Sequence, residues 1–156
     1  AMTKNLPPQI RLATLDDLEA LIEGNQGVAL ETENLALMRD TLAPGISAIL
    51  TDPHKGLYWV ACDPAGIVIG QTLITYEWSD WRNAPIWWLQ SVYVWPNARG
   101  QGVFTALLRH IEAEAREAGA RDIRLYADTT NQKAHHTYQA LGFATGHYQV
   151  FEKPLD

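Results

Sequence analysis

The chain has 156 residues, 47% hydrophobic and 19% charged, with a formal net charge of −6 at pH 7. These proportions are typical of a folded domain with a substantial core and exclude a disordered chain. The acidic balance, without any basic run, argues against general nucleic-acid binding. No apolar run reaches the roughly 18 residues of a membrane-spanning helix, and no signal-peptide pattern opens the chain. We therefore expect a cytoplasmic protein without nucleic-acid or membrane partners.

The chain reads as a single domain over residues 1–156, in which residues 1–8 form an N-terminal tail. Ala1 ahead of Met2 is typical of a cloning scar. The one cysteine, Cys62, lies in a predicted strand, so we expect a buried structural thiol, no intramolecular disulfide and a reducing compartment. No set of side chains is spaced to bind a metal ion.

The first half of the chain predicts three strands and two helices. Thr14 is a helix cap followed by two acids, and leucines at helical spacing come next. Residues 24–34, which include two glycines, are ambiguous. The predicted elements are a strand over 9–13, a helix from Thr14, a helix over 41–50, and a hairpin of strands 57–62 and 67–78.

The second half alternates strands and helices. Gly119 and Gly142 each follow an apolar helical pattern and indicate where that helix ends. The predicted elements are strand 86–95, helix 101–118, strand 123–127, helix 131–141 and a final strand 148–153. A strand, a helix and a strand in this order indicate parallel neighbours joined by a right-handed crossover. The whole chain is therefore predicted to be an α/β domain.

One stretch, from Leu89 to Leu108, joins an apolar strand to an amphipathic helix through Arg99-Gly100-Gln101-Gly102. The first N–H groups of a helix lack partners within it, and the helix dipole makes that end positive. Glycines let the backbone approach a phosphate closely, and an arginine adds a forked cation. Three interpretations are open: an ordinary connection, a nucleotide-binding loop that lacks the usual lysine or third glycine, and the loop of a known protein family, which a second segment can identify.

A second segment favours the third interpretation. Residues 131–143 contain Asn131, Ala134, Tyr138, Gly142 and Phe143 at the spacing Asn-x-x-Ala-x-x-x-Tyr-x-x-x-Gly-Phe. Together with the arginine and glycines upstream, this pattern resembles the GNAT superfamily of acyl-CoA N-acyltransferases. Phe104 departs from that family, which usually has glycine or alanine at its position.

The resemblance implies a single-domain GNAT fold, with a mixed, twisted sheet of six or seven strands, four flanking helices and two central parallel strands that splay apart. It also implies acetyl-CoA as co-substrate, with the pantetheine arm against the strand edge and the pyrophosphate at the glycine loop. The residues that it assigns to coenzyme binding are Val92, Tyr93, Val94, Arg99, Gly100, Gln101, Gly102, Val103, Phe104, Asn131, Ala134 and Tyr138.

The resemblance further implies acetyl transfer to a primary amine by direct attack in a ternary complex. The expelled thiolate, with a reference pKa of about 8.5, benefits from a proton donor, and Tyr138 is the candidate. The position where several relatives carry an acid holds Gln90 here. Glu77 on the preceding strand is therefore the best remaining candidate for the general base, with a water chain as an equal alternative.

The acceptor is expected to be a small amine, a polyamine-like molecule or a peptide. Glu31 and Glu33, in the early loop that lines the acceptor channel in the family, either attract an amine or are solvated charges. The six tryptophans, between Trp59 and Trp95, either build the core, wall an acceptor pocket or bury the face of a homodimer. A coenzyme A-binding module without catalytic activity is the alternative function, favoured by Gln90 and Phe104.

Overall fold

The structure, a computed structural model, describes residues 6–156. Residues 1–5 of the predicted tail, including the proposed cloning scar, lie outside the described residues. The elements are β1 (Gln9–Leu12), α1 (Leu18–Glu33), α2 (Arg39–Thr51), β2 (Leu57–Cys62), β3 (Val68–Ser79), β4 (Ala84–Val94), α3 (Val103–Glu117), β5 (Asp122–Leu125) and α4 (Gln132–Ala140), with 3₁₀ turns at Leu15–Asp17 and Pro96–Ala98. They divide between two compact units, Ala1–Tyr126 and Ala127–Asp156, which we describe in turn.

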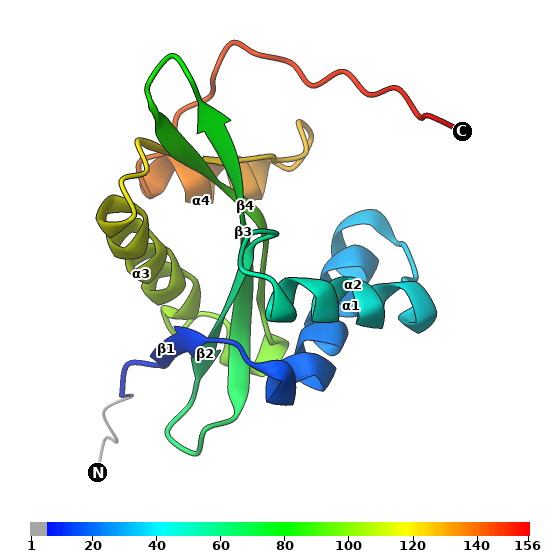
Figure 1. Cartoon of the computed structure of the whole chain (residues 1–156). Coiled ribbons are helices and arrows are strands. Elements are labelled where there is room, and N and C mark those ends of the chain that lie inside the picture. The colour runs from blue at the N-terminus through cyan, green and yellow to red at the C-terminus, as the bar shows by residue number, and fades with distance from the viewer. Residues whose placement is uncertain (1–5) are drawn as a thin grey trace. The chain divides into compact units, whose positions relative to one another are not determined.

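The first unit contains a five-stranded sheet in the order β1-β2-β3-β4-β5 (Figure 1). The first four strands are antiparallel to their neighbours, and β4 and β5 are parallel. Because α3 connects these two strands, the predicted strand–helix–strand unit is confirmed. The predicted α/β class and the four helices are confirmed as well.

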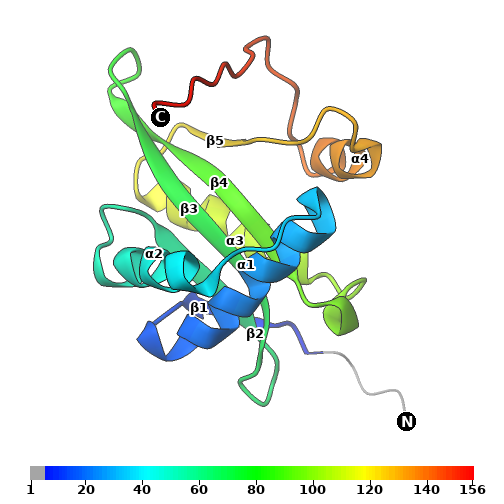
Figure 2. The same ribbon diagram turned by 90° about the vertical axis from the view of Figure 1, so that its right-hand side faces the viewer.

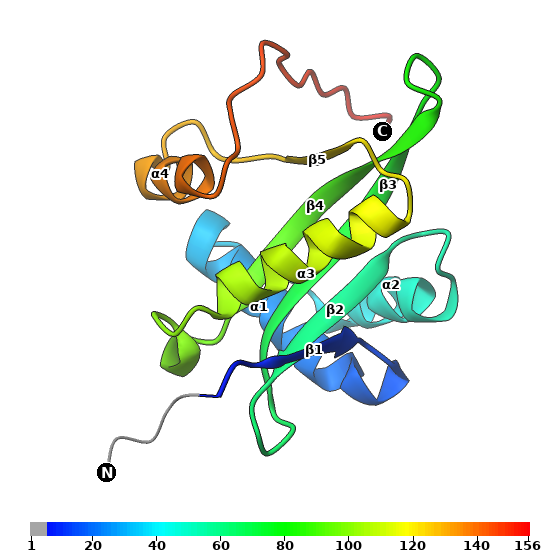
Figure 3. The ribbon, with the colours of Figure 1, turned by 90° about the vertical axis from the view of Figure 1, so that its left-hand side faces the viewer.

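Helices cover both faces of this sheet. α1 and α2 lie on one face (Figure 2), and α3 crosses the other (Figure 3). Successive side chains of β2 alternate between the two layers, as the pleat of a strand requires. Tyr58 and Val60 pack with Ile46 of α2, whereas Trp59 packs with Ile111 of α3. A strand buried on both sides therefore has no polar face, which explains the continuous apolar run of β2 in the sequence.

The second unit contains α4 and no strand among its described residues. The predicted strand over residues 148–153 is wrong, and so is the count of six or seven strands, because the described chain forms five. Apolar alternation indicates that a segment can form a strand, but a strand forms only where its backbone groups pair with a neighbour. Residues 148–153 have no regular structure, and the side chains of Tyr148 and Phe151 are largely exposed.

The ambiguous segment 24–34 is the second half of α1. Its two glycines weaken the helical pattern in the sequence, yet both are required by close packing against the sheet. A Cβ at Gly24 would lie 2.1 Å from the Gln71 side chain, and one at Gly27 would lie 2.6 Å from the Tyr93 ring. The helix tolerates the lower propensity of glycine because these positions bring α1 against β3 and β4.

The turn that precedes α1 is held by a buried carboxylate. Asp17 is 7% exposed. It accepts hydrogen bonds from both terminal nitrogens of Arg11, at 2.8 and 2.9 Å, and from the backbone N–H of Thr14 at 2.8 Å. The Arg11 guanidinium is the largest cause that lowers the pKa of this carboxyl below its usual value. Asp17 therefore ties β1 to the start of the helical layer.

We predict that Asp17→Asn lowers the free energy of unfolding by about 2 kcal/mol at neutral pH, because charged hydrogen bonds in a buried site are lost. Since the native pKa of Asp17 is lowered, its contribution is complete above about pH 4 and is lost as the pH falls through the native pKa. Urea unfolding at pH 7 and pH 3 measures this. The exposed neighbour provides the control, Asp16→Asn, and equal acid sensitivity in wild type and Asp17→Asn would contradict the prediction.

A second prediction compares two glycines inside helices. Gly24→Ala lowers stability by roughly 1 kcal/mol or more, because the displaced Gln71 side chain is buried. Gly45→Ala, in α2, raises stability by about 0.5–1 kcal/mol, because a Cβ there meets nothing within 4 Å and alanine favours the helix. Thermal and urea unfolding of both variants measure the difference. A stabilised Gly24→Ala variant would show that the packing of α1 is looser than described.

Candidate active site

The connection from β4 to α3 presents bare backbone. Gly100 and Gly102 have φ angles of +76° and +80°, which side chains rarely permit. A Cβ at either position would meet nothing within 4 Å. α3 begins at Val103, two residues later than predicted, and has no side-chain N-cap. The first turn of this 15-residue helix therefore offers its N–H groups and its positive dipole end beside an unobstructed loop.

β4 contains a bulge next to this loop. Leu73 pairs with Ser91 and Ile74 pairs with Leu89, which leaves Gln90 as the extra residue. A bulge bends its strand and increases the local twist. The parallel pairing with β5 ends at the same level, with Leu89 opposite Leu125. In the described chain, β4 therefore continues over residues 90–94 without β5 beside it.

The free side of β4 carries backbone groups of alternate residues. The N–H of Trp95 donates to the carbonyl of Ile69 at 3.0 Å. Because antiparallel pairing alternates, Tyr93 turns its backbone groups toward β3, whereas Val92 and Val94 turn theirs to the opposite side. The Val94 carbonyl accepts a hydrogen bond there from the side chain of Arg99. This edge can therefore pair with an extended ligand as another strand would.

The Arg99 side chain interacts with a backbone carbonyl, a carboxylate and an aromatic ring. Its Nε donates to the Val94 carbonyl at 2.9 Å, and its Nη2 donates to both carboxylate oxygens of Glu31, at 2.9 and 3.0 Å. The guanidinium carbon lies 5.4 Å from the centroid of the Tyr93 ring. The sequence did not predict the contact with Glu31, which comes from the last turn of α1. The signal for it was Gly27, whose lack of a side chain brings α1 against Tyr93.

Tyr93 lies at the centre of this cluster. Burial is the largest cause that raises the pKa of its phenol, and the Glu31 carboxylate adds to the effect. Its ring also contacts that of Trp95 edge-on, with centroids 5.2 Å apart. The indole Nε1 of Trp95 donates to Glu23 at 3.4 Å. Two carboxylates of α1, Glu23 and Glu31, thus lie one turn before and one turn after Gly27, the glycine that faces Tyr93.

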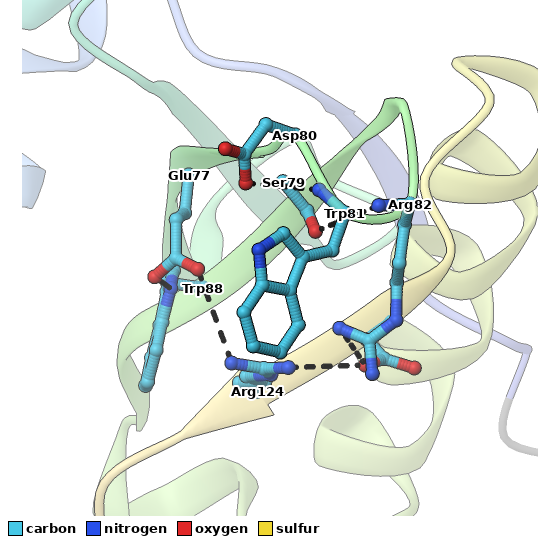
Figure 4. Close-up of polar contacts among 8 residues, drawn as sticks. Glu77, Ser79, Asp80, Trp81, Arg82, Trp88 and Arg124 are labelled. Atoms are coloured by element: carbon cyan, nitrogen blue, oxygen red, sulfur yellow. Dashed lines mark hydrogen bonds and ion pairs between the residues drawn. The ribbon is translucent and has the colours of Figure 1, made fainter.

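Glu77 belongs to a polar network on the hairpin of β3 and β4 (Figure 4). Its carboxylate accepts a hydrogen bond from Trp88 Nε1 at 3.2 Å and lies 3.9 Å from Arg124 Nη1. The Trp88 ring stacks on Tyr126 with centroids 4.5 Å apart. Two strand positions away, Gln90 Nε2 donates to the hydroxyl of Thr75 at 2.8 Å. In the ladder, Glu77 pairs with Ile86, four residues before the bulged Gln90.

The tryptophans have different environments. Trp59 and Trp87 are buried in the layer between the sheet and α3, so the core interpretation is confirmed for these two. Trp78 and Trp81, near the tip of the hairpin, are 63% and 94% exposed. The core therefore accounts for only part of the aromatic concentration.

The second unit carries the remaining predicted residues. Asn131 caps α4, as predicted, because its Oδ1 accepts the N–H of Ala134 at 3.1 Å. The ring of Tyr138 contacts that of Phe143 edge-on, with centroids 5.9 Å apart. The backbone carbonyl of Tyr138 accepts a hydrogen bond from the N–H of Phe143 at 2.9 Å. Burial raises the pKa of the Tyr138 phenol. Asp128 accepts hydrogen bonds from the N–H and the hydroxyl of Thr130 at the turn before this helix.

The structure places the predicted site residues in three groups. Residues 92–94 and 99–104 adjoin one another at the open edge of β4 and the start of α3, and Glu77 lies on the hairpin of β3 and β4. Asn131, Ala134 and Tyr138 share α4 in the second unit. Within residues 6–156, no group of three or more His, Cys, Asp or Glu side chains is arranged to hold a metal ion. None of the described helices combines the length and the apolar character needed to cross a bilayer.

A comparison with protein families matches residues 16–143 to the model described as the acetyltransferase (GNAT) family. Among curated proteins, an aminoglycoside N(6')-acetyltransferase type 1 of Stenotrophomonas maltophilia is 27% identical over 154 residues, with 96% of this chain and 95% of that protein covered. A thialysine N-epsilon-acetyltransferase of Bos taurus is 32% identical over 81 residues, which cover 51% of this chain and 47% of the relative.

Solved structures agree with these matches. A possible acetyltransferase from Clostridium difficile 630 has a TM-score of 0.91 and 36% identity, with 97% of this chain and 99% of that chain covered. An aminoglycoside acetyltransferase from a soil metagenome, solved in complex with sisomicin, has a TM-score of 0.78 at 16% identity and covers 96% of this chain and 97% of its own. This second likeness concerns the fold alone.

Proposed function

Because the chain belongs to the GNAT acetyltransferase family, we propose that it transfers the acetyl group of acetyl-CoA to a primary amine by direct attack in a ternary complex. The observation that carries the proposal is the open edge of β4, which runs directly into the bare loop at the start of α3. One surface therefore offers both strand pairing for a pantetheine arm and N–H groups for a diphosphate.

On this proposal, each part of the cofactor meets a different kind of backbone group. The edge at Val92 and Val94 pairs with the amides of pantetheine. The N–H of Val92 points to the same side and polarises the thioester carbonyl, whose oxygen becomes negative during attack. Gly100, Gln101, Gly102, Val103 and Phe104 supply N–H groups to the diphosphate. Asn131 and Ala134 contribute from α4, as the family resemblance implies.

The reaction removes two protons from the attacking nitrogen and adds one to the departing sulfur. An alkylammonium has a pKa of about 10, so a proton must leave before the nitrogen attacks the thioester carbon. Glu77 is our proposed acceptor of that proton, through water, because its carboxylate is exposed and accepts a hydrogen bond from Trp88 of β4. As the carbon–nitrogen bond forms, the carbon–sulfur bond breaks, and Tyr138 donates its phenolic proton to the departing thiolate. The newly bonded nitrogen then releases its second proton, which restores the phenol and leaves a neutral amide.

The acceptor is proposed to be a small amine or a peptide amine. The relatives named for aminoglycosides and thialysine support a small molecule with several amino groups. The net charge of −6 favours the approach of such cations. The chain's own acceptor within this class is taken up in the next subsection.

The test measures binding and turnover separately. We expect calorimetry to show that acetyl-CoA binds and that ATP and NAD do not, and free thiol to appear when amines are added. Binding without thiol release on any amine would favour the alternative of a coenzyme A-binding module. Stabilisation by ATP or NAD in place of acetyl-CoA would overturn the assignment altogether.

A further prediction concerns Tyr138. Replacement by Phe removes the proton donor and leaves the ring, so we expect kcat to fall by roughly 10²-fold or more while the Kd for acetyl-CoA changes little. Because burial raises the pKa of this phenol, it ionises at higher pH than an exposed tyrosine, and the wild-type rate should show no loss from its ionisation around neutral pH. Steady-state kinetics from pH 6 to 10 measure both effects, and unchanged kcat in Tyr138→Phe would exclude the donor role.

A further inference from the structure

The contacts of the Arg99 guanidinium indicate which kind of ligand its surroundings can bind. Its guanidinium lies between the carboxylate of Glu31, at 2.9 and 3.0 Å, and the ring of Tyr93, at 5.4 Å. A carboxylate paired with an aromatic face is the combination that holds organic cations. Glu31 also lies in the last turn of α1 (Leu18–Glu33), where the negative end of the helix dipole favours a positive charge. The chain therefore contains a cation site that its own arginine occupies.

The Arg99 side chain lies where the cofactor is proposed to bind. Nε of Arg99 donates to the Val94 carbonyl at 2.9 Å, on the edge that would pair with the pantetheine arm. Pantetheine and Arg99 compete for that carbonyl. A diphosphate at the neighbouring glycine loop carries more negative charge than the Glu31 carboxylate and binds guanidinium strongly. Cofactor binding therefore removes one partner of Arg99 and offers it a stronger one.

We propose that Glu31 and Tyr93 form the binding site for a cationic group of the acceptor, and that Arg99 fills this site until acetyl-CoA draws it to the diphosphate. This inference rests on the proposed function. The nitrogen that is acetylated must be neutral when it attacks, so the cation held by Glu31 is a second one. The acceptor is thus an amine that carries at least two cationic groups, and it binds after the cofactor.

The ion pair is exposed enough to exchange partners. The side chains of Arg99 and Glu31 are 47% and 41% exposed. Exposed pairs of this kind contribute little stability, so a competing diphosphate can separate them. Gly27 and the bond from Trp95 to Glu23 hold this part of α1 against β4 independently of Arg99. Glu31 therefore keeps its place beside Tyr93 when the arginine leaves.

The first test is the affinity for coenzyme A, measured by calorimetry. Glu31→Gln removes the competitor for Arg99, so we expect the Kd to fall by up to about fivefold, the range of an exposed ion pair. The matched control is Glu19→Gln. Glu19 lies on the same helix and pairs with Arg39 at 2.8 Å, about 18 Å along the axis from Glu31. The control should leave the Kd unchanged, and an equal or weaker affinity in Glu31→Gln would overturn the proposal.

The second test uses cadaverine and n-pentylamine, which share a five-carbon chain and differ by one cation. Calorimetry with coenzyme A, which carries no acetyl group, allows an acceptor to bind without reacting. We expect wild type to bind cadaverine only when coenzyme A is present and to prefer it to n-pentylamine. Glu31→Gln should lose that preference, and Glu19→Gln should keep it.

Arg99→Ala removes the internal cation, so this variant should bind cadaverine without coenzyme A, although its affinity for coenzyme A falls. Equal binding of cadaverine by wild type with and without coenzyme A, or failure of Arg99→Ala to gain that binding, would overturn the inference. These outcomes leave the acetyltransferase assignment intact, because they presuppose that coenzyme A binds. Absence of coenzyme A binding in wild type would instead count against the proposed function itself.

Discussion

The end of the β4–β5 pairing at Leu89 and Leu125 is the constraint on which the rest of the site depends. Up to that level, β4 is an interior strand and its backbone groups are used on both sides. Beyond it, one side of the strand has lost its neighbour, and buried or half-buried backbone groups must find another partner. The bulge at Gln90 accompanies this change and turns the strand there. A free edge of this kind is what an amide-containing ligand can complete.

The same edge brings the cofactor loop and the helical layer together. The loop from β4 leads to Arg99, whose side chain returns across the edge to the Val94 carbonyl and reaches Glu31 of α1. α1 can come this near only because Gly24 and Gly27 have no side chains. Two glycines that reduce the intrinsic stability of the helix thereby bring the end of α1 within reach of the glycine loop. Any ligand that moves Arg99 also changes the charge that Glu31 presents.

The fold illustrates how local and non-local effects divide. The long amphipathic helix α3 and the capped helix α4 follow from apolar spacing and from local caps, so the sequence pattern identifies both with small shifts at their ends. Residues 148–153 show the limit of the same reasoning. Their aromatic and β-branched residues are suited to a strand, but the described chain provides no ladder for them, and local preference cannot supply a partner. The segment 24–34, which is ambiguous in the sequence, shows the opposite effect, because close packing against the sheet requires glycines that propensity alone disfavours in a helix.

The sequence by itself determined the family of the protein and the local features on which the proposed site is built: the glycine loop after an apolar strand, and the asparagine, alanine and tyrosine spaced along one helix. Those features are local, since they depend on residues within a turn or two of one another. Only the tertiary structure decided which backbone groups of β4 lack a neighbouring strand, that Gln90 is the bulged residue, and that Glu31 pairs with the guanidinium of Arg99. Strand register and a contact between residues 68 positions apart arise from the packing of the whole unit, which no short pattern specifies.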